Sequence, residues 1–184
     1  MASIRSFFVR HISGFYMKRS KMDTDPLFAR RVFQARMTKL PAARGVRHVS
    51  EQIDGVDCEW LIPAGCDDAP VIYYLHGGAY IMGSPQTHRR VVSFIAKAAG
   101  MRALLPDYRL APEHRYPAQL EDSLRVWRAL VKGGLGPSSV AIAGDSAGGN
   151  LSVATMLSLR AAGEPLPAAC FLLSPWLDLV GDGE

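Results

Sequence analysis

Four short, mainly apolar runs from residue 71 onward limit the folds that this chain can adopt. The runs are VIYYLH, RALLPD, VAIAG and ACFLLS, and segments with helical periodicity separate them at residues 89–99, 119–131 and 147–161. Strands that are apolar on both faces and alternate with helices are typical of a parallel sheet with both faces covered. We therefore expect an α/β fold with a mostly parallel sheet and helices on both faces.

The first part of the chain predicts two further units. Residues 46–52 and 58–62 are strand-like and flank Asp54-Gly55, which predicts a β-hairpin at the start of a core spanning residues 45–184. Residues 1–44 read as a separate helical segment, with one helix around residues 7–16 and a second over residues 27–40. Asp25-Pro26 is a good start for the second helix, and Pro41 ends it.

Charge is distributed unevenly along the 184 residues. Residues 1–47 hold 11 Lys or Arg and 2 Asp, a net charge of +9, and the remaining 10 basic and 15 acidic residues give −5. A basic segment of this kind is compatible with binding to nucleic acid or to an anionic membrane surface. No aromatic interleaving or nucleic-acid motif accompanies it, so we interpret it as a solvated helix face and expect no nucleic-acid partner.

Composition also bears on location and cofactors. The apolar stretch near residues 7–9 is interrupted by Arg5 and Arg10, so it predicts neither a signal peptide nor a membrane span. The three cysteines are odd in number and form no C-x-x-C motif, which favours neither a disulfide framework nor a zinc site. We expect a cytoplasmic protein without stable membrane insertion, and with no metal or cofactor.

The run GDSAG, residues 144–148, matches the G-x-S-x-G pattern of a nucleophilic serine. It lies between an apolar strand and a helix, which is the context that gives this motif its meaning. The sharp turn brings neighbouring chain segments close, so a Cβ at Gly144 or Gly148 is expected to collide. Ser146 is thus predicted as the catalytic nucleophile, at the positive N-terminus of a helix.

A second motif lies at the end of an earlier strand, where YYLHGGAY contains His76-Gly77-Gly78. Two glycines let the backbone turn its N–H groups toward a substrate oxygen. Acyl transfer needs such donors, because negative charge accumulates on the carbonyl oxygen in the tetrahedral intermediate. The N–H groups of Gly77, Gly78 and Ala147 are predicted to form this oxyanion hole; the alternative is a plain strand-to-helix turn.

These stretches, together with LPDYRLAPEHRYPAQLED and LLSPWLDL, resemble the hormone-sensitive-lipase-like carboxylesterases of the α/β-hydrolase superfamily. The resemblance covers nearly all of the chain, in the family's order and spacing. It implies an α/β-hydrolase fold, with Ser146 as nucleophile and residues 1–44 as a helical cap over the acyl pocket. Tyr80 and Met82 lie just past the two glycines, and this position makes them candidates for lining the acyl pocket and binding substrate, with plain packing as the alternative.

Other polar residues near the motifs have structural interpretations. Asp145 is adjacent to the serine on a strained turn and cannot also orient a histidine, so we interpret it as a supporting group. Asp107, Tyr108, Arg109 and Glu113 follow a strand end, and we predict a structural polar network there, with direct substrate contact as the alternative.

The base that Ser146 would need is not evident in the sequence. In this fold the chain order is serine, acid, histidine, and no histidine follows Ser146. Asp178 comes one strand too early to match the family's acid. The resemblance thus implies that the chain is truncated before the last strands, the catalytic acid and the histidine. Residues 169–173 then form an exposed sheet edge, through which the chain can form a homo-oligomer.

These observations leave three hypotheses. The first is a serine hydrolase of esters or lactones with short to medium acyl chains, inactive or weak as this chain because an unassisted serine is a poor nucleophile. The second is a non-catalytic ligand-binding protein on the same fold, as in plant hormone receptors that resemble this family and lack the histidine. The third is a membrane or nucleic-acid binder that uses the basic segment.

Overall fold

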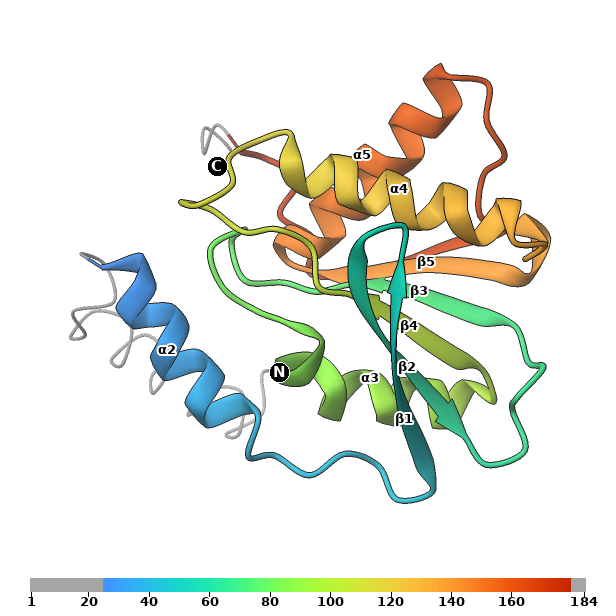
Figure 1. The fold of residues 1–184 in the computed structure, drawn as a ribbon, viewed down its shortest axis with the longest axis horizontal. Helices are drawn as coiled ribbons and strands as arrows, with labels where there is room; N and C mark the ends of the chain where they lie inside the picture. The colour runs from blue at the N-terminus through green and yellow to red at the C-terminus, as the bar shows by residue number, and fades with distance from the viewer. Residues whose placement is uncertain (1–24, 180–184) are drawn as a thin grey trace, which may run out of the picture.

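The computed structural model describes residues 25–179, and in it a single sheet lies between helices on both faces (Figure 1). The strand order is β1-β2-β4-β3-β5-β6. β1 pairs with β2, and β2 with β4, in antiparallel fashion, whereas β4, β3, β5 and β6 run parallel to one another. The predicted α/β fold with a mostly parallel sheet is therefore confirmed.

The elements follow the predicted alternation of strand and helix. The strands are β1 (Val46–Ile53), β2 (Val56–Pro63), β3 (Val71–Leu75), β4 (Arg102–Pro106), β5 (Val140–Asp145) and β6 (Ala169–Leu173). The helices are α2 (Pro26–Met37), α3 (Pro85–Ala99), α4 (Ala118–Lys132) and α5 (Ala147–Ala161), with a short 3-10 helix, η2 (Pro137–Ser139), before β5.

Local capping explains where two helices begin. Asp25 caps α2 by accepting from the N–H groups of Leu27 and Phe28, which confirms the predicted start at Asp25-Pro26. α3 begins at Pro85 rather than at residue 89, because Ser84 and Thr87 form a capping box ahead of the apolar periodicity. The other expected N-terminal helix, around residues 7–16, lies outside the described residues.

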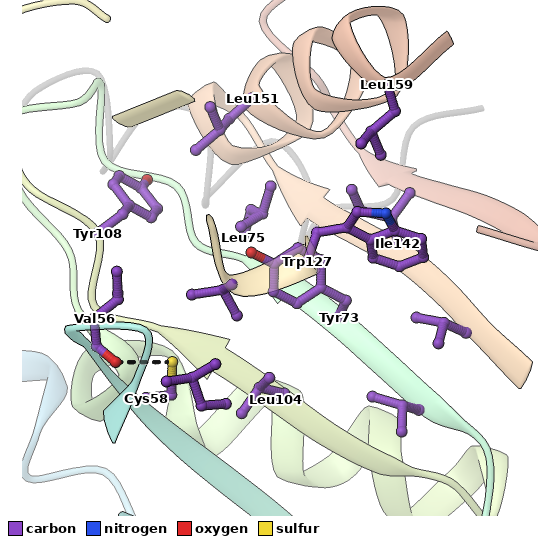
Figure 2. Close-up of a cluster of buried hydrophobic side chains, with 14 residues drawn as sticks. Val56, Cys58, Tyr73, Leu75, Leu104, Tyr108, Trp127, Ile142, Leu151 and Leu159 are labelled. Atoms are coloured by element: carbon purple, nitrogen blue, oxygen red, sulfur yellow. Dashed lines mark hydrogen bonds between the residues drawn. The ribbon is translucent and has the colours of Figure 1, made fainter. Parts of the chain in front are cut away.

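The alternating side chains of β3 divide the core into two layers. Tyr73 and Leu75 belong to the cluster beneath α4 and α5, where Trp127 packs against Tyr73 (Figure 2). Ile72 and Tyr74 point to the opposite face, into the cluster covered by α3. All five residues of β3 are buried. This strand is apolar on both faces because helices cover both, as the continuous apolar run predicts.

The N-terminal hairpin and β6 form the two sides of the sheet. β1 and β2 join at Asp54-Gly55, where both residues have positive φ, of 46° and 80°. On the other side, β6 pairs with β5 and with no other described strand. Its first three residues are exposed, so β6 is an edge of the sheet that residues 25–179 form.

Candidate active site

Ser146 occupies a strained turn between β5 and α5. Its φ and ψ are 51° and −120°, a conformation that non-glycine residues rarely adopt. Its N–H donates to the Leu173 carbonyl at 3.0 Å and its own carbonyl accepts from the Trp176 N–H at 2.9 Å, which hold the turn from the β6 side. Ser146 is exposed although the residues that follow it are buried. The turn therefore presents the serine at the surface.

The glycines on either side of Ser146 allow this turn to pack against β3. A Cβ at Gly148 would lie 2.0 Å from the Leu75 carbonyl oxygen and 2.4 Å from that of His76. A Cβ at Gly144 would lie 2.4 Å from the Gly148 oxygen. The predicted collisions at both glycines are confirmed, and they show that the first turn of α5 lies directly against the end of β3.

The loop of residues 77–82, called the oxyanion-loop after the role that the sequence predicts for its amides, follows β3 and turns back on itself. The N–H groups of Ile81 and Met82 both donate to the Gly78 carbonyl, at 3.0 and 2.9 Å. Gly78 has a φ of 128°, and a Cβ there would lie 2.1 Å from the Met82 carbonyl oxygen. Ala79 and Tyr80 also have positive φ, of 54° and 62°. This loop thus has positive φ at three consecutive residues, two of which, Ala79 and Tyr80, are of types that rarely adopt it.

The main-chain donors near Ser146 differ in how they are used. The Gly77 N–H donates to Asp145 Oδ1 at 2.9 Å, so in this structure it is not open to a ligand, in contrast to the sequence prediction. The N–H groups of Gly78 and Ala79 have no hydrogen-bond partner within residues 25–179. Ala147 is the first residue of α5, so its N–H has no acceptor within the helix. Sequence reasoning missed Ala79, whose positive φ has no signal in the sequence.

Asp145 supports this loop. Its Oδ1 accepts from the Tyr74 hydroxyl and the Gly77 N–H, both at 2.9 Å, and lies 3.5 Å from His88 Nε2. Burial raises the pKa of Asp145, but the contacts with His88, Tyr74 and Gly77 outweigh it and leave the pKa below its usual value. The carboxylate therefore joins the end of β5 to the loop after β3, in keeping with the supporting interpretation.

His76 is buried beside the same cluster. Its ring stacks on Tyr108 at 4.2 Å and on His88 at 5.3 Å between centroids. Burial, followed by the proximity of His88, lowers the pKa of His76 to about 3, so the ring is neutral. Its Nδ1 lies 2.9 Å from the Gly77 carbonyl, which requires a proton on Nδ1 and leaves Nε2 as an acceptor. In the described part of the chain, no histidine hydrogen-bonds Ser146.

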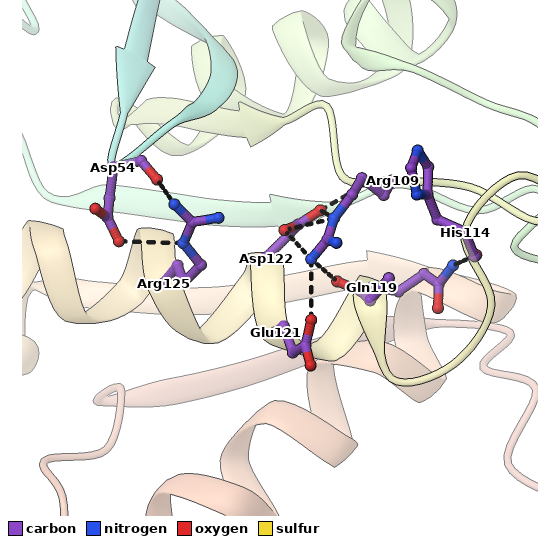
Figure 3. Close-up of polar contacts among 8 residues, drawn as sticks. Asp54, Arg109, His114, Gln119, Glu121, Asp122 and Arg125 are labelled. Carbon is purple, nitrogen blue, oxygen red and sulfur yellow. Dashed lines mark hydrogen bonds and ion pairs between the residues drawn. The ribbon is translucent and has the colours of Figure 1, made fainter.

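The residues after β4 form polar contacts that fix loops to α4. Arg109 binds Asp122 with its main-chain N–H and its guanidinium, and it also reaches Glu121 at 3.0 Å (Figure 3). The Tyr108 hydroxyl donates to the His76 carbonyl. Burial, followed by nearby Asp57 and Glu59, raises the pKa of Asp107 to about 6. These contacts support the predicted structural network.

A cavity of about 410 Å³ lies against the first turns of α5, and Ser146 is not among the residues that line it. It is bounded by residues of the loops after β3 and β4 and of α4 and α5, among them Tyr80, Ala111, Leu120, Asn150 and Leu151. Tyr80 donates to Asn150 Oδ1 at 2.6 Å across its wall. Asn150 lies one helical turn after the serine, to whose carbonyl its N–H donates. Of the two predicted substrate-binding residues, Tyr80 lines this cavity and Met82 does not.

Residues 25–179 offer neither a membrane-spanning helix nor a cluster of metal ligands. No helix there is long and apolar enough to span a membrane. No three His, Cys, Asp or Glu side chains in that range are grouped so as to hold a metal ion.

Known proteins resemble this chain in sequence and in structure. A family model described as an alpha/beta hydrolase fold matches residues 72–184. An acetyl-hydrolase of Streptomyces hygroscopicus is 47% identical over 125 residues, which are 68% of this chain and 42% of that protein. An esterase of Acinetobacter venetianus is 39% identical over 67% of this chain and 41% of its own length.

The structural comparison agrees. A crystal structure of an esterase from the bacterial hormone-sensitive lipase family superposes with a TM-score of 0.83 and 44% identity, covering 87% of this chain and 54% of that one. The chain thus spans about half the length of the proteins that it matches.

Proposed function

Because this chain belongs to the α/β-hydrolase family, within its hormone-sensitive-lipase-like carboxylesterases, we propose that it is part of a serine hydrolase of carboxylic esters or lactones. The observation that carries the proposal is the exposed Ser146 at the strained turn between β5 and α5. The names of the relatives, acetyl-hydrolase and esterase, agree with this reaction.

In the proposed reaction, Ser146 Oγ attacks the ester carbonyl, the C–O bond to the alcohol breaks, and the serine proton ends on the leaving alcohol. Water then hydrolyses the acyl-serine to the carboxylic acid and restores the Ser146 hydroxyl. The N–H groups of Gly78 and Ala147 stabilise the negative charge on the carbonyl oxygen, and Ala79 adds a further donor. They can meet there because the start of α5 packs against the end of β3. Gly77 supports the loop through Asp145 instead of donating directly.

The cavity against the first turns of α5, one helical turn beyond Ser146, is proposed to take the apolar part of the substrate. Its mainly apolar lining and its volume of about 410 Å³ suit a short to medium acyl or alcohol chain. Tyr80 and Asn150 close one wall through their hydrogen bond. Met82 has its main chain in the oxyanion-loop turn, and it contributes there to loop conformation.

The 184-residue chain is proposed to turn over esters only weakly by itself. No histidine within residues 25–179 hydrogen-bonds Ser146, and removing triad partners leaves the residual catalysis of binding and the oxyanion hole. The N-terminal segment, residues 1–44, is proposed as a cap, since α2 contacts the loops beside the cavity. A cytoplasmic location is also proposed, in keeping with cysteines 58, 66 and 170 being unpaired thiols.

The test combines covalent labelling with turnover. An alkyl fluorophosphonate should label Ser146 slowly, as located by peptide mass spectrometry, and Ser146→Ala should remove the adduct. Hydrolysis of p-nitrophenyl butyrate by the same chain should barely exceed that of Ser146→Ala. Absence of any adduct on Ser146 contradicts the nucleophile assignment, whereas rapid turnover that depends on Ser146 contradicts the proposed weakness.

A non-catalytic ligand-binding protein is the second candidate, favoured by the cavity and by the absence of a histidine partner for Ser146 in the described residues. It predicts saturable binding of an apolar ester that is left intact, with no labelling of Ser146. The labelling experiment therefore separates the two candidates.

A further inference from the structure

Arg30 on α2 connects the helix to both loops beside the candidate site. Its Nε donates to the Ile81 carbonyl at 2.7 Å, in the oxyanion-loop. Its Nη2 donates to the Ala111 carbonyl at 2.6 Å, in the loop after β4. One side chain thus spans two segments that are separated by 30 residues of sequence, counted from 81 to 111.

The second loop also holds the Arg30 guanidinium. Glu113 accepts from Nη1 and Nη2, both at 2.8 Å, as a bidentate pair. The hydrogen bond from Arg30 lowers the pKa of Glu113, so the carboxylate is charged at neutral pH. This ion pair is partly exposed and contributes little energy by itself. Its effect is directional, because it orients the planar guanidinium toward the two carbonyls.

The oxyanion-loop requires such external support. Ala79 and Tyr80 have positive φ, and strained conformations of this kind persist only where surrounding contacts fix them. The two loops also meet directly, through the Ala111 N–H that donates to the Tyr80 carbonyl at 2.9 Å. Arg30 adds hydrogen bonds to the Ile81 carbonyl of the first loop and to the Ala111 carbonyl of the second. The two loops are therefore linked both directly and through Arg30.

We propose that Arg30 is a positioning residue that fixes the oxyanion-loop against the loop of residues 110–113. Arg30 bonds Ala111 directly and bonds Ile81, the residue after Tyr80. Both Tyr80 and Ala111 line the cavity. Arg30 therefore sets the distance between the two loops that bound the cavity on this side. It also sets the direction of the Gly78 and Ala79 N–H groups. The consequence for substrate rests on the proposed function, whereas the link between the loops does not.

Hydrogen exchange tests the link without any activity. In the whole chain, Arg30→Met should raise amide exchange about tenfold at Ile81, Met82 and Ala111, whose N–H groups are hydrogen-bonded within and between the two loops, because both loops lose a charge-assisted bond. Arg30→Lys should restore only part of the protection, since an ammonium cannot reproduce the fork. Arg36→Met, on the exposed side of the last turn of α2, is the matched control and should change neither loop.

Ligand affinity is a second measurement, and it should not change if Arg30 only stabilised the fold. In a Ser146→Ala background, which removes acylation, Arg30→Met should weaken binding of p-nitrophenyl butyrate by about tenfold at a temperature where both proteins are folded. Unchanged exchange in both loops would overturn the proposal, as would equal protection in Arg30→Met and Arg36→Met. If the parent fails to bind the ester, the assignment of the cavity fails, and loop exchange alone still decides the role of Arg30.

Discussion

Strands β3 and β6 have similar sequences, VIYYL and ACFLL, and both run parallel within one sheet. Every residue of β3 is buried, whereas three of the five residues of β6 are exposed. β3 lies between two strands and under helices on both faces, while β6 pairs with β5 alone among the described strands. The comparison shows that an apolar run predicts a strand, and that its neighbours decide how much of it is buried.

The largest effect is expected where the start of α5 meets β3. Gly148→Ala places a Cβ 2.0 Å from the Leu75 carbonyl oxygen, so backbone must shift in the centre of the sheet. We expect the free energy of unfolding to fall by on the order of 4 kcal/mol, measured by urea denaturation.

Gly136→Ala is the matched control for this substitution. The glycine has a φ of −64° and no backbone atom within reach of a new Cβ, so the change should lie within about 0.5 kcal/mol. A Gly148→Ala protein as stable as this control would contradict the close packing of α5 on β3.

The second effect concerns pH at the end of β3. His76 has a pKa of about 3 in the folded chain and 6.5 as its ordinary value. Between these values the unfolded chain binds a proton that the folded chain does not, so stability falls as pH falls. From about pH 7 to about pH 4, the wild type should lose about 3 kcal/mol more than His76→Phe.

Urea titrations of both proteins across this range measure the difference. Phenylalanine preserves the stack on Tyr108 and removes the titration. Parallel loss of stability in the two proteins would show that His76 does not titrate differently in the folded and unfolded states.

The third prediction compares the two strands directly. Leu75→Ala in β3 removes a fully buried side chain and should cost about 3 kcal/mol. Leu172→Ala in β6 removes a partly exposed one and should cost about 1 kcal/mol. Chemical denaturation of the two variants measures both values, and equal costs would mean that β6 is as well covered as β3.

The smallest effect on stability is expected at Phe171, which is 48% exposed on β6. Phe171→Lys should change the free energy of unfolding by less than about 0.5 kcal/mol. A charge on an edge strand opposes strand pairing between copies, so self-association should decrease. Sedimentation velocity at several protein concentrations tests the homo-oligomer expected at this edge, and unchanged association would place the contact elsewhere.

Much of the site could be predicted because it depends on short-range patterns. The glycines around Ser146 indicate that backbone segments approach closely there, and their spacing after an apolar strand predicts the turn. The role of Gly77 could not be predicted in this way. Its N–H donates to a carboxylate on another strand, at a distance of 2.9 Å that only the pairing of β3 with β5 creates.

The alternation of strands and helices, the hairpin at Asp54-Gly55 and the turn at Ser146 could all be predicted from the amino-acid sequence alone, because each follows from local backbone preferences and hydrophobic periodicity. Three features emerged only from the folded chain: which amides remain open, which of Tyr80 and Met82 lines the cavity, and the hydrogen bonds from Arg30 to both loops. These features depend on contacts between segments distant in sequence, which no local pattern encodes.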